Sequence, residues 1–425
     1  MRLTIVNQFY PPDAAPTGRL AADLAEHRAA LGDTVTVLAS RANYVAMCDQ
    51  APRPGFANLK VCRLWTPACA WRGTLGRCLS FLAFLLLAAW RFLWMPRQDV
   101  VVAMTTPPFL VCAALVHKLR HPACRVILWN MDCYPEVAER DGLIKPGGWI
   151  SRTLRAVNRA AFRRLDRVLC LDPAMAELLQ ANYGRPGHSL PTAVVPNWEP
   201  LADCPRYAAA APHRDRQTSE LLGEKFVVIY TGNRGRGHEF DTVLAAAERL
   251  RNEPVCFLFV GGGTRTPALR QAIAAAHLEN VLLVPYVPQA HLHRLLRAAD
   301  CALVTLRNEM LGIMSPSKRH ASLAFGLPIV YVGPPGSNAD QAITRFGCGV
   351  SLRPGDVQGL VAALQDPRAN PHDMARLRYR ACLAFEQEYC DQKTLPLLDA
   401  LLDYPAAARE MPVPEKMPAT LRRAA

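Results

Sequence analysis

The sequence has 425 residues, of which 51% are hydrophobic and 20% charged, and it carries a formal net charge of +13. This length suits two domains, and the composition excludes a disordered chain. A basic excess favours an acidic partner, and without zinc-finger spacing, an RNA-binding aromatic signature or a long basic run we expect anionic lipid or a phosphorylated small molecule and no nucleic acid.

Fourteen cysteines are scattered along the chain, mostly inside apolar runs such as "RVLCLD", and no CxxC pair occurs. This pattern predicts buried thiols in a reducing cytosol rather than disulfides. The first residues, "MRLTIVNQFYPP", form a strand-like run and a turn, without the apolar core and cleavage site of a signal peptide. We therefore expect a cytoplasmic protein.

Short β-branched runs alternate with helical stretches from the start of the chain to residue 197. The runs "LTIVNQF", "TVTVLAS", "DVVVAM", "RVILWN" and "RVLCLD" are strand candidates, and a helix is expected near Gly18 to Leu31. Continuous apolar strands without polar alternation are typical of a parallel sheet that helices cover on both faces. The sequence predicts a doubly wound α/β domain over residues 1–197.

Residues 79–95, "LSFLAFLLLAAWRFLWM", are apolar except for Ser80 and Arg91, and they belong to a helix expected over 75–95. About a dozen residues precede Arg91, fewer than the roughly 20 that a membrane-spanning helix needs. Two interpretations remain open: a helix buried in the core, or a helix lying on the bilayer with tryptophans and arginines near the headgroups. Both hold if one face packs on the domain and the other meets lipid.

Residues 198–223 lose this periodicity and are rich in alanine, proline and charge, which predicts a linker. The α/β pattern restarts over 224–369, helices are expected over 370–403, and 404–425 is expected to be a loose tail. Two doubly wound, Rossmann-like domains that face each other create a cleft at the carboxyl ends of their strands, where ligands bind in such folds.

The stretch "YTGNRGRGHEF", over 230–240, lies between an apolar strand and a helical segment. Its glycine order differs from the dinucleotide fingerprint G-x-G-x-x-G, and no G-K-[ST] of a P-loop follows. Small residues that let the backbone turn, with Arg234, Arg236 and His238 near a helix start, favour a diphosphate site. The alternative is a surface turn with solvated arginines.

Three further segments of the second half carry candidates for nucleotide or sugar binding. The run "GGG" at 261–263 either leaves room for a ligand or only turns the chain into a helix, and "PYVP" at 285–288 ends another strand. In the loop after "CALVTL", Ser317 is expected to cap a helix whose first turn holds Lys318, and a cation at that position is unfavourable unless an anion binds there. The candidates are Gly262, Gly263, Tyr286, Gly312 and Ser317.

Polar residues of the first half follow its strands. Asp13, Thr17 and Gly18 come after the first strand, and Asp132 and Glu136 come after "RVILWN". Carboxylates at this edge could bind acceptor hydroxyls or stabilise a developing cation. Each one could equally be a helix cap or a member of an ion pair.

These motifs together resemble glycosyltransferase family 4, which has the GT-B fold. The resemblance rests on "VVPNW", "YTGNRGRGHEFDTVLAAAERL", "FLFVGGG" and "AFGLP", and covers the chain to about residue 390. The segments "SPSKRHASLAFGLPIVYVG", "NQFYPPDAAPTGRL" and "DCYPE" are similar to the bacterial branch that acts in exopolysaccharide or O-antigen assembly. The family implies retaining transfer of a sugar from a nucleotide diphosphate, with the donor on the second domain, the acceptor on the first, and neither cofactor nor metal.

The resemblance also assigns roles to residues. Glu309 matches the first acid of the family's E-x7-E element, but Ser317 stands where the second Glu is counted from it, and Ala321 where it is counted back from "AFGLP". The family's cleft histidine would fall near Met131, so Asp132 is the substitute candidate, and catalysis is assigned to Asp132 and Glu309. The residues that would hold the diphosphate in place of a metal are Gly232, Asn233, Arg234, Arg236 and Lys318.

We therefore expect a retaining, metal-independent glycosyltransferase of bacterial surface polysaccharide synthesis. Its acceptor would be a polyprenyl-diphosphate-linked sugar or another glycan, and the enzyme would lie on the inner face of the cytoplasmic membrane. Two alternatives stay open: a sugar-nucleotide 2-epimerase on the same fold, and an inactive scaffold that binds sugar nucleotides.

Overall fold

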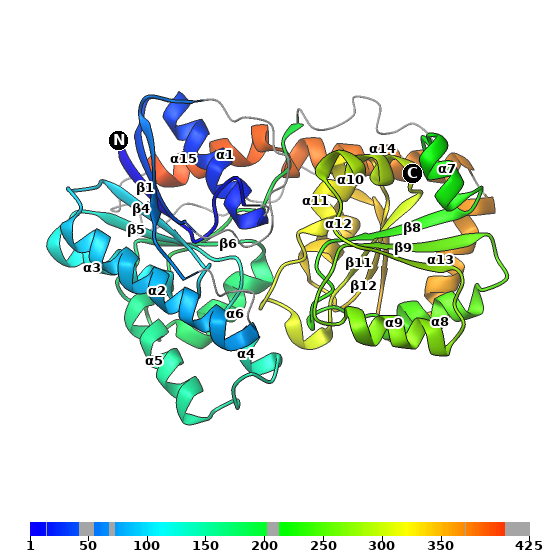
Figure 1. The fold of residues 1–425 in the computed structure, drawn as a ribbon, viewed down its shortest axis with the longest axis horizontal. Coiled ribbons are helices and arrows are strands. Elements are labelled where there is room, and N and C mark those ends of the chain that lie inside the picture. Colours follow the sequence, from blue (N-terminus) through cyan, green and yellow to red (C-terminus); the bar gives the residue numbers. More distant parts are fainter. Residues whose placement is uncertain (14, 42–54, 68–72, 202–211, 370, 404–425) are drawn as a thin grey trace.

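The computed structural model of the protein describes residues 1–13, 15–41, 55–67, 73–201, 212–369 and 371–403. Two parallel β-sheets, each covered by helices, lie side by side and form two domains (Figure 1). The expected GT-B architecture of two doubly wound α/β domains is confirmed. The expected tail at 404–425 lies outside the described residues, as does the middle of the expected linker.

The first domain holds a seven-stranded parallel sheet in the order β3-β2-β1-β4-β5-β6-β7. Its inner strands are mostly apolar and buried after their first residue, as a sheet with helices on both faces requires. The strands are β1 (Arg2–Val6), β2 (Thr34–Ser40), β3 (Leu59–Leu64), β4 (Val100–Met104), β5 (Arg125–Trp129), β6 (Arg167–Cys170) and β7 (Thr192–Val194). The helices are α1 (Pro16–Ala30), α2 (Gly73–Trp94), α3 (Leu110–Arg120), α4 (Glu136–Arg140), α5 (Trp149–Phe162) and α6 (Pro173–Tyr183).

The second domain holds a six-stranded parallel sheet in the order β10-β9-β8-β11-β12-β13. The strands are β8 (Phe226–Thr231), β9 (Val255–Val260), β10 (Val281–Val284), β11 (Cys301–Thr305), β12 (Ile329–Val332) and β13 (Gly349–Leu352). The helices are α7 (Arg216–Leu222), α8 (Asp241–Arg249), α9 (Thr266–Ala275), α10 (Gln289–Ala298), α11 (Lys318–Ala324), α12 (Asn338–Phe346), α13 (Val357–Ala369), α14 (Pro371–Ala384) and α15 (Asp391–Asp403). A 3₁₀ turn, η2 (Asn308–Met310), follows β11, and a π turn, η3 (Phe385–Tyr389), precedes α15.

The strand order of each sheet reverses next to its first strand. The reversals lie between β1 and β4 in the first sheet and between β8 and β11 in the second. Such a reversal leaves a crevice at the carboxyl ends of the strands, because the two following loops diverge to opposite faces of the sheet. The loops after β8 and β11, which carry most of the donor-side candidates, flank the reversal of the second sheet.

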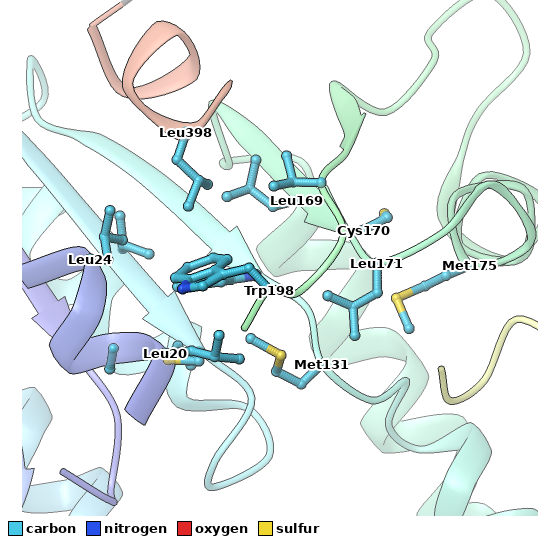
Figure 2. Close-up of a cluster of buried hydrophobic side chains, with 14 of the residues drawn as sticks. Leu20, Leu24, Met131, Leu169, Cys170, Leu171, Met175, Trp198 and Leu398 are labelled. Carbon is cyan, nitrogen blue, oxygen red and sulfur yellow. The ribbon is translucent and has the colours of Figure 1, made fainter. Parts of the chain in front are cut away.

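The segment expected to be a linker is partly structured. Trp198 is 1% exposed and stacks on Trp129 at the end of β5, with 5.5 Å between ring centroids, and its indole N–H donates to Asp23. Figure 2 shows Trp198 among apolar side chains that include Leu20, Leu24 and Leu398. The helix α7, capped by Asp215, also lies inside this segment. The sequence did not indicate these features, because an isolated tryptophan and a seven-residue helix produce little periodicity.

The last helix, α15, returns to the first domain and lies beside α1 (Figure 1). Buried Arg28 of α1 donates hydrogen bonds to Asp33, Asp399 and Asp403, and His27 lies 2.7 Å from Asp399. The two domains are therefore joined twice, once by the chain through Trp198 and once by α15.

The helix α2 has one face in the domain and one in solvent. Its buried residues include Ser80, Phe84, Ala88 and Phe92, which are spaced by four. The exposed large hydrophobic residues of α2 are Leu75, Leu79, Leu82, Leu86, Trp90 and Trp94. By length and composition the described stretch Leu75–Trp94 could cross a membrane, and 28% of it is buried in the domain.

Candidate active site at the ends of β8 and β11

The loops after β8 and β9 pack against each other, backbone to backbone. A Cβ on Gly261 would stand 2.2 Å from the carbonyl oxygen of Gly232, and one on Gly263 would stand 2.4 Å from Asn233 Oδ1. Gly232, Gly261 and Gly263 have φ of 100°, 130° and 140°, which a residue with a side chain rarely adopts. The structure thus brings the two predicted glycine segments into one wall.

Arg234 holds these two loops together. Its side chain donates to the backbone oxygens of Phe259 and Gly261 and to Thr266 Oγ1, and the residue is 2% exposed. Burial lowers the pKa of its guanidinium below the ordinary value. Arg234 makes these hydrogen bonds inside the domain, so its role is to hold the two loops of the wall together.

Arg236, two residues further on, points toward the other domain. It is exposed, and its guanidinium donates to the backbone oxygen of Asp141, after α4. Gly237, between Arg236 and His238, lies under Met314, since a Cβ on this glycine would stand 2.4 Å from the Met314 sulfur. The two arginines that the sequence placed in one diphosphate site therefore have different surroundings.

Lys318 is the first residue of α11, and its side chain extends to the loop after β8. Its Nζ lies 2.9 Å from His238 Nε2 and 4.8 Å from the centroid of the Tyr230 ring. Burial lowers the pKa of Lys318 to about 7. The sequence indicated His238 only as an added donor near the loop, and its contact with a residue 80 positions away had no local signal.

Tyr286 borders the same wall from the loop after β10. Its ring is the nearest neighbour that a Cβ on Gly262 would meet, at 2.9 Å, and the residue is 62% exposed. An exposed aromatic face beside a glycine turn leaves room for a flat group to stack.

The loop after β11 differs from the sequence expectation in two ways. The Ser317 side chain does not cap α11, because Ser317 itself has helical backbone angles. Gly312 has a φ of 73°, and its Cβ would stand 2.6 Å from the backbone oxygen of Ala174 in the first domain, so this glycine allows a close interdomain contact. Glu309, on η2, forms an ion pair of 2.7 Å with Arg307.

Asp132 lies where the first domain meets this loop. It forms an isolated antiparallel bridge with Met314, and the next residue, Cys133, donates its backbone N–H to the oxygen of Ile313. Burial, with a smaller contribution from the nearby charge of Asp141, raises the pKa of Asp132 to about 6.

A small cavity of about 20 Å³, room for about one water molecule, lies beside Asp132 in the first domain. Its lining combines polar residues, among them Thr105, Asn130, Asp132 and Asn158, with apolar side chains. Thr105 Oγ1 accepts hydrogen bonds from the backbone N–H groups of Met131 and Asp132, which fixes the turn that carries the carboxylate.

The other predicted residues of the first domain have structural contacts. Glu136 is 4% exposed and accepts hydrogen bonds from Arg155, Asn182 and Tyr183, which matches the ion-pair alternative. Asp13 is buried, and Thr17 Oγ1 accepts a bond of 3.4 Å from Asn7. Gly18 lets α1 approach the loop after β1, since its Cβ would stand 3.1 Å from the backbone of Phe9 and Tyr10.

Within the described residues, no group of three or more His, Cys, Asp or Glu side chains is arranged to hold a metal ion. Besides Arg234, cations near the glycine wall include Lys318, whose Cε would stand 3.6 Å from a Cβ on Gly232, and Arg236 of the same loop.

Two family models match the chain in succession: the glycosyl transferase 4-like domain over residues 17–198, and glycosyl transferases group 1 over residues 213–382. The chain belongs to glycosyltransferase family 4. This glycosyltransferase is 25% identical over 381 residues to WcaI of Escherichia coli (strain K12), whose name assigns it to glycosyl transfer in colanic acid biosynthesis. The match covers 86% of this chain and 91% of WcaI.

Solved structures share the fold. Sucrose-phosphate synthase from Thermosynechococcus elongatus has a TM-score of 0.70 at 14% identity and covers 94% of this chain and 98% of its own. HepE from Anabaena in complex with UDP-glucose has a TM-score of 0.66 at 14% identity and covers 95% and 99%. At these identities the similarity shows the GT-B fold alone.

Proposed function

We propose that this glycosyltransferase takes its sugar from a nucleoside diphosphate donor, with retention at the anomeric carbon and without a bound metal. The observation that carries the proposal is the position of Lys318, whose Nζ lies beside the glycine wall at the β8–β11 reversal with a neutral histidine as its partner. A cation there, beside a glycine turn with positive φ, suits an anionic group. HepE, on the same fold, was solved with UDP-glucose.

The donor would lie along this wall of the second domain, over residues 224–369. We assign the base to the exposed ring of Tyr286 and the diphosphate to the backbone of Gly232 and Asn233, with Lys318 and Arg236 as cations. Arg234 contributes by holding the loops in register. The lack of a side chain at Gly262, Gly263 and Gly312 lets the donor or neighbouring atoms come close to the backbone. We assign exposed Ser317 to the binding of the sugar.

The chemistry we propose is electrostatic. When the bond between the sugar and the diphosphate breaks, negative charge grows on the leaving oxygens, and fixed cations nearby stabilise that charge. We propose that Asp132, from the first domain, and Glu309, from η2, stabilise the positive charge that develops on the sugar. A lone carboxylate with a pKa near 6 is ionised at neutral pH and can also accept a proton from an acceptor hydroxyl.

The acceptor would bind to the first domain, over residues 1–197. We place it beside Asp132, where the loop after β5 meets the loop after β11. Because WcaI is named for colanic acid biosynthesis, we propose an acceptor of bacterial surface polysaccharide synthesis, a polyprenyl-diphosphate-linked sugar or a glycan. Asp13, Thr17 and Glu136 would support the acceptor site indirectly, through their contacts inside the first domain.

We further propose that the outer face of α2 lies on the inner leaflet of the cytoplasmic membrane. Its four leucines and two tryptophans are each at least 52% exposed and follow one face of the helix. Exposed Arg77 and Arg97 flank the face, and Arg120 lies 5.7 Å from the Trp94 ring centroid, so the rim is cationic. Anionic headgroups complement such a rim, and the buried face of Phe84, Ala88 and Phe92 keeps the helix in the plane of the bilayer.

The test is transfer from a panel of radiolabelled nucleotide sugars, incubated with the purified protein and bacterial membranes. We expect label to enter a lipid-extractable or polymeric product with retained anomeric configuration, and EDTA to leave the rate within about twofold of the control, as expected without a metal. Formation of a 2-epimer of the free donor would identify an epimerase instead. Donor binding without any conversion would identify a scaffold.

A further inference from the structure

His238 is held between two groups that fix its protonation. Its Nδ1 lies 2.7 Å from the backbone oxygen of Thr305, at the end of β11, and its Nε2 lies 2.9 Å from Lys318 Nζ. A carbonyl oxygen only accepts, so Nδ1 carries the hydrogen and the Nε2 lone pair faces Lys318. Lys318 is therefore the donor of this hydrogen bond.

The groups in direct contact with this pair are neutral or positive. The Tyr230 ring faces Lys318 Nζ from β8, and Arg265, ahead of α9, donates to the backbone oxygen of His238. Within the described residues Lys318 forms no ion pair. The other charged or titratable neighbours on these elements are Arg234, Glu239, Arg319 and His320. Their side chains bond to backbone groups, to each other or, for Arg234, also to the Thr266 hydroxyl.

A half-buried ammonium with only a neutral partner holds its proton weakly when no anion is bound. Burial lowers the pKa of Lys318 to about 7, and burial together with the charge of Lys318 holds the pKa of His238 well below its ordinary value. Of the two side chains, Lys318 is the one that gains a proton when negative charge arrives. A diphosphate diester brings two negative charges to the wall that Lys318 faces.

We propose that binding of the donor diphosphate draws one proton from solvent onto Lys318, and that His238 is the positioning residue that aims the resulting ammonium at the diphosphate. This inference rests on the proposed function, because it takes a nucleotide sugar as the ligand. No covalent bond changes: the Lys318 amine becomes an ammonium, and the buffer loses the proton.

Proton linkage follows with a definite sign. Well below pH 7 Lys318 is already charged, and binding takes up little; well above pH 7 the amine is mostly neutral, and binding takes up close to one proton. The affinity for the donor is highest below pH 7 and falls about tenfold for each pH unit between 7.5 and 9. A nucleotide sugar is the right probe, because a free nucleoside diphosphate has a terminal phosphate with its own pKa of about 6.

The experiment is titration calorimetry of the full chain with UDP-glucose, GDP-mannose, ADP-glucose and dTDP-glucose. Each titration is run from pH 6.5 to 9 in two buffers that differ in ionisation enthalpy, so that the difference in heat counts the protons. Lys318→Met removes the titrating group without changing the length of the side chain much, and it should abolish both the uptake and the slope. His291→Phe, on the exposed side of α10, is the matched control and should behave as the wild type.

Two substitutions isolate His238. His238→Gln keeps an acceptor near the Nε2 position, whereas His238→Phe keeps a ring beside Tyr230 and Phe240 but removes the acceptor. The loss of a hydrogen bond to a charged group predicts an affinity about 10- to 100-fold weaker for His238→Phe at pH 6.5, with most of it restored in His238→Gln. Thermal midpoints report whether either variant has lost its fold.

Each outcome decides something. If a nucleotide sugar binds with less than about 0.2 proton taken up at pH 8, the linkage is wrong and the proposed function stands. If His238→Phe binds as the wild type does, His238 has no positioning role. If none of the four probes binds, the proposed function is wrong and this inference with it.

Discussion

The carbonyl oxygen of Gly232 occupies the place where a side chain on Gly261 would begin, because a Cβ there would stand 2.2 Å away. Gly261 also has a φ of 130°. Gly261→Ala should therefore push the two loops apart and cost about 3 kcal/mol of unfolding free energy. Donor affinity should fall with it, since both loops form the wall.

Urea unfolding and donor titration measure the two effects. Gly55→Ala is the control, because Gly55 has no atom within 4 Å of an added Cβ and no positive φ. A Gly261→Ala protein that is as stable as the control would mean that the loops are not packed as described.

Arg234 and Arg236 should respond differently to replacement by methionine. Buried Arg234 donates to two backbone oxygens and a hydroxyl, so Arg234→Met should lower the unfolding free energy by about 3 kcal/mol. Exposed Arg236 should change it by less than about 0.5 kcal/mol. If Arg236 contacts the diphosphate, Arg236→Met lowers kcat/KM about tenfold, the order that a charge-assisted hydrogen bond supplies. Equal stability loss in both variants would contradict the separation.

Much of this arrangement could be predicted from the sequence. Apolar strands without alternation, each followed by a helix, indicated two parallel sheets, and the glycines after two of those strands indicated a ligand wall at their ends. Local patterns carry this information, because strand and turn residues act on their immediate neighbours.

Contacts between distant segments could not be predicted in the same way. The pairing of His238 with Lys318, the return of α15 to Arg28 and the burial of Trp198 each join positions that no local periodicity relates. The sequence placed Arg234 and Arg236 in one role because both are cations of one loop. Arg234 is buried and Arg236 exposed although only one residue separates them, a difference that their shared residue type does not indicate.

Protonation of Asp132 should lower the rate of the reaction at acid pH. Burial and the Asp141 charge raise the pKa of Asp132 to about 6, so the carboxylate is ionised above pH 6 and protonated below. If the ionised form acts, kcat falls below pH 6, and Asp132→Asn loses about 100-fold in kcat at pH 8. The measurement is the pH–rate profile of both proteins.

Stability supplies an independent readout of the same carboxylate. A carboxyl group whose pKa is higher in the folded protein than in the unfolded chain lowers stability as pH rises through that interval. Asp132→Asn should therefore be more stable than the wild type at pH 8 and equal to it at pH 4. A variant that is less stable at pH 8 would contradict the assigned pKa.

The outer face of α2 should bind anionic membranes. Replacing Leu82, Leu86 and Trp90 by serine removes three side chains that are 55–62% exposed and should reduce flotation with vesicles of anionic lipid at least tenfold. The matched control replaces exposed Leu221 and Tyr379 in the second domain, which should float as the wild type does. Unchanged flotation of the folded triple variant would rule out α2 as the contact.

The bond between α1 and α15 should depend on pH. Arg28 lies 2.9 Å from Asp399 and 2.7 Å from Asp403, and its side chain is 4% exposed. Removing one partner of a buried ion cluster costs about 3–5 kcal/mol, so Arg28→Met should unfold at markedly lower urea concentration.

The hydrogen bond from Arg28 lowers the pKa of Asp403, so Asp403 stabilises the fold above the carboxyl's unfolded pKa, and this contribution is lost as pH falls through the lowered value. Asp403→Asn should therefore be less stable than the wild type at pH 7, with a difference that shrinks below about pH 4. A difference that does not vary with pH would mean that Asp403 acts through packing rather than through its charge.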